Sequence, residues 1–114
     1  MNIKEIEERS GLTRANIRYY EQEGLLAPVR RENKYRDYSE EDLETLLRVA
    51  LLRSLGFSLE EIRRLQSGEA DFAAAMRERS AALESEGQRL LAARNVCDAI
   101  SREVTSYSAL RPED

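Results

Sequence analysis

The sequence predicts a mainly α-helical fold, in which a helix-turn-helix module with a small β-hairpin wing precedes one long C-terminal helix. Three observations support this prediction. Two short, capped helical segments flank Gly11, an extended stretch rich in Arg and Tyr follows Pro28, and from Asp71 to Tyr107 there is no proline and only one glycine. A chain of 114 residues fits one small domain followed by an extended element.

The composition excludes several classes of function. The chain has no histidine, one cysteine, Cys97, and no glycine-rich phosphate loop. These features exclude a disulfide framework, a zinc ribbon and a His-dependent catalytic set within one chain. We therefore expect no enzyme, no metal site and no cofactor. No apolar run is long enough for a signal peptide or a membrane span, so we expect a reduced, cytoplasmic protein without a membrane partner.

Charge is unevenly distributed along the chain, whose formal net charge is −4. Residues 14–36 contain six Arg or Lys against three Glu, whereas residues 69–114 contain six Arg against nine Asp or Glu. The overall acidity excludes a globally basic nucleic-acid binder but allows a locally basic one.

The first helix is predicted over residues 2–9. Asn2 can cap it, and Glu5 stands where the reciprocal partner of a capping box belongs. Gly11 breaks this helix before the next one begins.

The second helix is predicted over residues 14–23. Thr13 can cap its start, and Gly24 can end it in a left-handed conformation. Two short helices joined by a tight turn that contains glycine are typical of a helix-turn-helix.

A hairpin is predicted after the second helix. Pro28 prevents a helix from continuing, and residues 29–31 and 34–38 can form two short strands around a turn at residues 32–33. The hairpin would carry basic and aromatic side chains near its tip.

A third helix is predicted over residues 40–54, with Ser39 as its cap. Helical spacing of apolar residues predicts one buried face. That face comprises Leu43, Leu46, Leu47, Ala50 and Leu51.

A fourth helix is predicted over residues 59–66. Ser58 and Glu61 fit a capping box, and Phe57 and Ile62 occupy the two positions of a hydrophobic staple. Gly68 is expected to end the helix.

One long helix is predicted from Asp71 to about Tyr107, roughly 36 residues and about 50 Å at the standard helical rise. Apolar residues recur every seven positions along it, and these positions, called a, form a seam together with the d positions of the same repeat. A partner helix from a second chain would cover this seam. Position a holds Met76, Leu83, Leu90, Cys97 and Val104, and position d holds Phe72, Arg79, Glu86, Ala93, Ile100 and Tyr107. We expect a winged helix-turn-helix domain at 1–68, a dimerisation helix at 69–107 and a tail at 108–114 with no separate effector domain.

The outward face of the second helix carries hydrogen-bonding groups. On a helical wheel with Ile17 facing inward, Arg14, Tyr20 and Glu21 lie on or beside the inner side. An Arg fork, a phenol and an amide bind phosphates and base edges, so we expect this helix to enter the major groove of double-stranded DNA. The outward positions are Ala15, Arg18, Tyr19 and Gln22.

The stretch "GLTRANIRYYEQEGLLAPVRRENKYRDYSEEDLETLLRVALLRSLGFSLEEIRRL" resembles the DNA-binding region of the MerR family of bacterial transcription regulators. The resemblance runs from Met1 to about Leu65. It implies a winged helix-turn-helix homodimer whose long helices pair antiparallel. It also implies binding to a pseudo-palindromic promoter, which such regulators distort so that RNA polymerase can engage it.

The resemblance also assigns residues. Arg18 and Tyr19 match the recognition-helix contacts, Lys34 replaces the usual glycine of the wing turn, and Arg14 and Ala15 stand where members of the family vary. The wing contacts are matched by Arg31, Asn33, Tyr35 and Arg36. The complete predicted DNA-binding set is Thr13, Arg14, Ala15, Arg18, Tyr19, Arg31, Asn33, Lys34, Tyr35 and Arg36.

The C-terminal part departs from metal-sensing members of that family. Those proteins carry a cysteine at the start of the dimerisation helix and further cysteines beyond it, whereas here the only cysteine is Cys97, inside the predicted seam. We therefore expect a minimal or missing effector module and assign Cys97 a packing role.

An antiparallel pair is also favoured by the seam itself, since Arg79 and Glu86 would face their own copies in a parallel pair. The register with the fullest overlap places Met76 opposite Ile100 of the partner subunit, with the crossing near Gly87. The predicted dimerisation residues are Phe72, Met76, Leu83, Gly87, Leu90, Ala93, Cys97, Ile100 and Val104.

Two alternatives are open from the residues alone. One is a small-molecule sensor with a pocket between the long helix of one chain and the DNA-binding module of the other, lined by Phe72, Met76 and Tyr107. The other is a coiled-coil adaptor whose helix-turn-helix binds protein instead of DNA.

Overall fold

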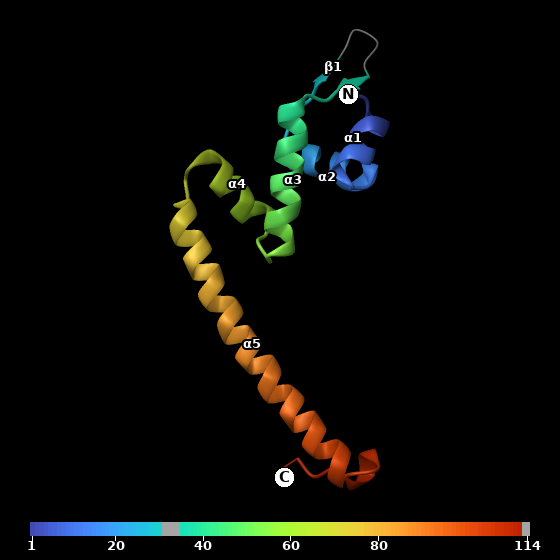
Figure 1. Cartoon of the computed structure of the whole chain (residues 1–114), viewed down its shortest axis with the longest axis vertical. Helices are drawn as coiled ribbons and strands as arrows, with labels where there is room; N and C mark the ends of the chain where they lie inside the picture. Colours follow the sequence, from blue (N-terminus) through green and yellow to red (C-terminus); the bar gives the residue numbers. More distant parts are fainter. Residues whose placement is uncertain (31–34, 113–114) are drawn as a thin grey trace. The chain divides into compact units, whose positions relative to one another are not determined.

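The computed structural model describes residues 1–30 and 35–112, and it divides the chain into two compact units. The first unit is Met1–Phe72, and the second begins at Ala73. Figure 1 shows the order of the elements, with helices α1 to α4 and a two-stranded sheet preceding the long helix α5.

Helix α1 (Ile3–Ser10) begins with the predicted capping box. The Asn2 side chain accepts a hydrogen bond from the Glu5 amide at 2.8 Å, and the Glu5 carboxylate accepts one from the Asn2 amide at 3.5 Å. Gly11 ends the helix with a φ of 73°, a conformation that costs glycine little.

Helix α2 (Arg14–Gln22) completes the helix-turn-helix. The Thr13 hydroxyl accepts a hydrogen bond from the Asn16 amide at 3.2 Å, which confirms the predicted cap. The helix ends one residue earlier than predicted, and Gly24 follows with a φ of 80°.

Strands β1 (Val29–Arg30) and β2 (Arg36–Asp37) form an antiparallel pair with Val29 opposite Asp37. Among the described residues, β2 is shorter than predicted, because neither Tyr35 nor Tyr38 belongs to it. One reason is that the Tyr38 amide donates to the Met1 carbonyl at 2.7 Å, so this residue pairs with the chain start instead of with β1. The last residue predicted for the first strand, residue 31, lies outside the described residues. The predicted turn at residues 32–33 lies outside the described residues.

Helices α3 (Glu40–Ser54) and α4 (Leu59–Ser67) confirm the predicted starts. Ser39 forms a capping box with Asp42, and Ser58 forms one with Glu61. Helix α4 ends at Gly68, whose φ is 81°.

The core of the first unit is apolar. Its buried side chains come from α1, α2, α3, α4 and the segments between them, and α3 packs against both α1 and α4. The buried side chains are Ile6, Ile17, Tyr20, Leu25, Leu26, Tyr38, Leu43, Leu46, Val49, Phe57, Leu59 and Ile62.

The predicted buried face of α3 was partly wrong. Leu47 and Leu51 are 45% and 60% exposed, whereas Val49 is 1% exposed. The packing partners of α3 select the stripe formed by Leu43, Leu46 and Val49, and the sequence pattern mixed this stripe with the neighbouring one. The helix therefore carries a second, solvent-exposed apolar stripe.

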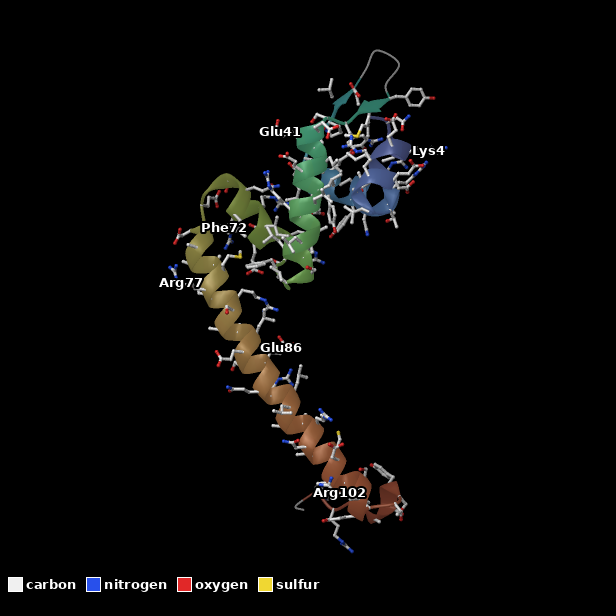
Figure 2. The ribbon with its side chains drawn as sticks, in the orientation of Figure 1. Lys4, Glu41, Phe72, Arg77, Glu86 and Arg102 are labelled. Carbon is white, nitrogen blue, oxygen red and sulfur yellow. The ribbon has the colours of Figure 1, made fainter. Side chains whose placement is uncertain are left out.

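Helix α5 (Phe72–Glu103) has 32 residues, none of them buried, and Figure 2 shows side chains such as Arg77, Glu86 and Arg102 projecting along it. The predicted end near Tyr107 was wrong, because the helix stops four residues earlier. Val104 and Thr105 are β-branched residues with low helix propensity. A short 3₁₀ turn, η1 (Tyr107–Ala109), follows. Among the described helices, none is long and apolar enough to span a membrane.

The two stripes of α3 can be distinguished by mutation. Leu46→Ala removes a fully buried side chain, so we expect the free energy of unfolding to fall by about 2–5 kcal/mol. Leu51→Ala truncates a side chain that is 60% exposed, and we expect a change below about 1 kcal/mol. Urea unfolding at one fixed protein concentration measures both. Equal losses would show that the buried face is assigned wrongly.

Candidate nucleic-acid interface

The outer face of α2 is set by its buried face. Ile17 is 0% exposed and Tyr20 is 8% exposed, which turns Arg18 and Tyr19 towards solvent. The Tyr19 side chain is 46% exposed. Ala15 and Gln22 are exposed as well, as the helical wheel predicted, and the capping residue Thr13 is also exposed.

Arg14 lies differently from the prediction, because it is exposed and not beside the inner side of α2. Glu7 of α1 binds both the backbone and the side chain of Arg14. The Glu7 carboxylate accepts the Arg14 amide at 2.8 Å and one of its terminal guanidinium nitrogens, Nη2, at 3.3 Å. These contacts, first the backbone hydrogen bond and then the side-chain bond, lower the pKa of Glu7.

Glu21 joins α2 to the wing. One carboxylate oxygen accepts the Arg36 Nε–H at 2.7 Å, and the other accepts the Tyr38 hydroxyl. The Glu21 side chain is only 10% exposed, so these charge-assisted bonds form where water competes weakly. The bond to Arg36 fixes the plane of the guanidinium through Nε without using its two terminal NH₂ groups.

The same contacts perturb Tyr38. Burial raises the pKa of the phenol above its ordinary value, and the hydrogen bond to Glu21 raises it further. The phenol therefore stays protonated and continues to donate to Glu21 across the ordinary pH range. Glu21 was not among the predicted site residues. The signal that could have identified it is its position as an acidic residue on the inner side of a helix within a basic segment.

The first residue also holds the wing. The Met1 amino group donates to the Asp37 carboxylate at 3.1 Å and to the Tyr38 carbonyl at 2.5 Å. Together with the amide of Tyr38 bonded to the Met1 carbonyl, these contacts fix β2 against the start of α1. Sequence reasoning missed this contact because a main-chain group leaves no pattern in residue types.

A cleft of about 270 Å³ lies where α1, α2 and the wing meet. It brings together guanidinium groups from separate elements, and Tyr35 on its wall is 73% exposed. Several guanidinium groups around one concave surface suit an anion such as a phosphate. The lining residues are Asn2, Ile3, Arg14, Arg18, Tyr35 and Arg36.

The structure thus brings together four of the predicted DNA-binding residues. Ala15 and Tyr19 lie on the same helix as two of them, and Thr13 caps that helix. The predicted wing residues Arg31, Asn33 and Lys34 lie outside the described residues.

The predicted dimerisation residues lie along α5, except Val104, which follows its last residue. Val104 still donates its amide to the Ile100 carbonyl at 2.8 Å. Apolar seam side chains are open to solvent, with Leu90 54% exposed, Phe72 57% exposed and Cys97 also exposed. Leu91 and Val96, which lie off the seam, are exposed too.

Comparisons with known proteins agree with this arrangement. Residues 1–69 match the family described as MerR HTH family regulatory protein. The HTH-type transcriptional regulator HmrR of Rhizobium leguminosarum bv. viciae is 52% identical over 65 residues, which are 57% of this chain and 50% of that protein. The chain therefore spans about half the length of curated relatives such as HmrR.

Two further proteins are similar over nearly the whole chain. An uncharacterized HTH-type transcriptional regulator of Pseudomonas aeruginosa is 40% identical over 112 residues, covering 97% of this chain and 77% of that protein. The crystal structure of the N-terminal part of MtaN, the Bacillus subtilis multidrug transporter activator, superposes with a TM-score of 0.76 at 29% identity, covering 93% of this chain and 99% of that chain.

The bond between Tyr38 and Glu21 predicts a specific loss of stability. Tyr38→Phe leaves a carboxylate oxygen that is largely shielded from water without its donor, so we expect the free energy of unfolding to fall by roughly 1–3 kcal/mol. Tyr35→Phe, at a side chain 73% exposed, is the matched control and should change little. Urea unfolding at neutral pH measures the difference, and identical curves would contradict the assignment.

The raised pKa of Tyr38 makes the contribution of this hydrogen bond to the free energy of unfolding depend on pH. Because the folded-state pKa of Tyr38 lies above that of an unfolded tyrosine, about 10, its stabilising contribution is complete below that pH. It is lost as the pH rises further towards the folded-state pKa. The difference between wild type and Tyr38→Phe should therefore shrink above about pH 10.

Proposed function

The chain belongs to the MerR family of helix-turn-helix regulatory proteins, and from this we propose that it binds promoter DNA as a homodimer and regulates transcription. The observation that carries the proposal is the cleft between α1, α2 and the wing, where arginines of α2 and of the wing line one surface. A solvated helix face alone would not need positive groups that converge from separate elements.

Each element has its own part in the proposed complex. Helix α2 enters the major groove, where the planar fork of Arg18 can donate to a guanine edge and the Tyr19 hydroxyl can reach a base or phosphate. The wing lies over the adjacent backbone, with Tyr35 and Arg36 donating to phosphates. Since phosphate contacts release counterions, binding should weaken steeply as salt concentration rises.

The dimer supplies the geometry of the operator. A helix of 32 residues without a buried side chain needs cover, and its exposed seam fits a second copy of itself. A two-fold dimer presents two copies of α2, so the operator would be pseudo-palindromic. Distortion of the DNA between the half-sites would add specificity and bring the promoter into a form that RNA polymerase engages.

Base reading and phosphate binding can be separated with two variants. Arg18→Ala should weaken binding to an operator selected from a random library by roughly 1–3 kcal/mol and affect random DNA less. Arg36→Ala should weaken both DNAs by similar factors and reduce the salt dependence of binding. Fluorescence anisotropy at two salt concentrations measures these effects. Similar losses on both DNAs for Arg18→Ala would exclude base reading by Arg18.

The seam can be tested by placing a charge within it. Leu90→Asp puts a carboxylate where the partner helix would exclude water, so we expect it to abolish dimerisation. Ser85→Asp adds the same charge at an exposed position outside the seam and serves as the control. Sedimentation equilibrium distinguishes monomer from dimer. A dimeric Leu90→Asp variant would place Leu90 outside the interface.

The direction of the paired helices predicts the behaviour of Cys97. In the antiparallel register its copy in the partner subunit lies about 27 Å away along the axis, beyond reach of a disulfide. Mild oxidation of dilute dimer followed by a non-reducing gel should therefore show little crosslinked species. Rapid and nearly complete crosslinking through Cys97 would require a different register.

A further inference from the structure

The C-terminal end of α2 is closed by two backbone hydrogen bonds. The Leu25 amide donates to the Tyr20 carbonyl and the Gly24 amide to the Glu21 carbonyl, both at 3.0 Å. With Gly24 in the left-handed region, this pattern is the Schellman motif that satisfies two of the terminal carbonyls. The carbonyls of Glu23 and Leu25 lie just beyond those that the motif satisfies, where no helical amide reaches them.

Two side chains of α4 bind these two carbonyls. Arg63 donates from Nη2 to the Glu23 carbonyl, and Gln66 donates from Nε2 to the Leu25 carbonyl at 3.1 Å. Arg63 and Gln66 are three residues apart, so they share one face of α4. The segment that they hold is anchored in the core, because Leu25 and Leu26 are 5% and 8% exposed.

Arg63 differs from Arg14 and Arg36 in the number of its carboxylate partners, because Arg14 pairs with Glu7 and Arg36 with Glu21, whereas Arg63 pairs with two carboxylates. Its terminal nitrogens also lie 2.5 Å from a Glu60 carboxylate oxygen and 3.5 Å from one of Glu23. These two carboxylates offset its charge, so it is poorly suited to hold a phosphate. A cation at the C-terminal end of a helix does suit the helix dipole.

We propose that Arg63 and Gln66 are positioning residues for the recognition helix α2, a proposal that rests on the DNA-binding function proposed above. By binding the carbonyls of Glu23 and Leu25 they fix the segment that follows α2, and with it the position of α2 along its own axis. Base contacts in the major groove depend on that position, whereas phosphate contacts tolerate small shifts.

The test compares three variants of the full chain. Arg63→Met and Gln66→Met each keep an unbranched side chain and remove one donor set. Arg64→Met is the control, because Arg64 is next to Arg63 in the chain but its side chain is 57% exposed and forms an ion pair with Glu60 at 3.5 Å. Each variant is titrated with a selected operator and with random duplex DNA at one salt concentration, and amide hydrogen exchange is followed over residues 23–26.

We expect Arg63→Met to weaken operator binding about tenfold and Gln66→Met about threefold, with changes below about twofold on random DNA and for Arg64→Met. Exchange of the amides at residues 23–26 should accelerate in the first two variants only. If Arg63→Met is too unstable to assay, Gln66→Met, which removes one neutral bond, decides the question.

Two outcomes would overturn the proposal. One is operator binding by Arg63→Met and Gln66→Met equal to that of Arg64→Met. The other is an equal loss on operator and random DNA, which would indicate a general structural role. Failure of the proposed function is a different result, because the wild-type chain would then show no salt-dependent binding to either DNA.

Discussion

The hydrogen bonds accepted by the Glu21 carboxylate are the interaction on which the surface that we propose faces DNA depends. This carboxylate is the point where a side chain of α2 meets both Arg36 and Tyr38 of the wing segment, at 2.7 Å from the Arg36 Nε. Without it, α2 would lose its hydrogen bonds to Arg36 and Tyr38, and the contacts of Met1 with Asp37 and Tyr38 would hold β2 against α1 but not against α2. The burial of this carboxylate makes the bonds strong and makes the loss of either partner costly.

Polar groups elsewhere in the first unit are also hydrogen-bonded. Helix starts are closed by Asn2, Thr13, Ser39 and Ser58, and no buried side-chain nitrogen or oxygen lacks a partner among the described residues. A unit of about seventy residues has a small core, so correctly capped helices contribute a useful share of its stability. The second unit differs, because α5 buries none of its residues, and we propose that a second chain covers it.

Helix caps were predictable from the sequence, whereas the residues buried by packing between helices were predictable only in part. The caps at Ser39 and Ser58 follow from residues three positions apart, and the structure confirms both. The burial of Val49 in place of Leu47 depends on which helices pack against α3, information that a periodic pattern does not contain. The early end of α5 reflects the low helix propensity of Val104 and Thr105, which the heptad pattern outweighed in the prediction.

Within the site, residue types identified the exposed groups but not what holds them. Arg18 and Tyr19 are exposed on α2 as predicted, because the position of Ile17 fixes the rest of a helical wheel. The bridging role of Glu21 and the contact between Met1 and β2 depend on long-range geometry. The hydrogen bonds from Arg63 and Gln66 of α4 were missed for the same reason, since about forty residues separate Arg63 from the carbonyl that it binds.

The most direct test of this account is the operator affinity of Glu21→Gln. Removing a negative charge near DNA should by itself strengthen binding, as we expect for the control Glu8→Gln at an exposed position of α1. If Glu21 holds the wing against α2, the effect has the opposite sign, because the amide binds Arg36 and Tyr38 less well. The account predicts weaker operator binding by Glu21→Gln than by wild type. Binding as tight as that of Glu8→Gln would contradict it.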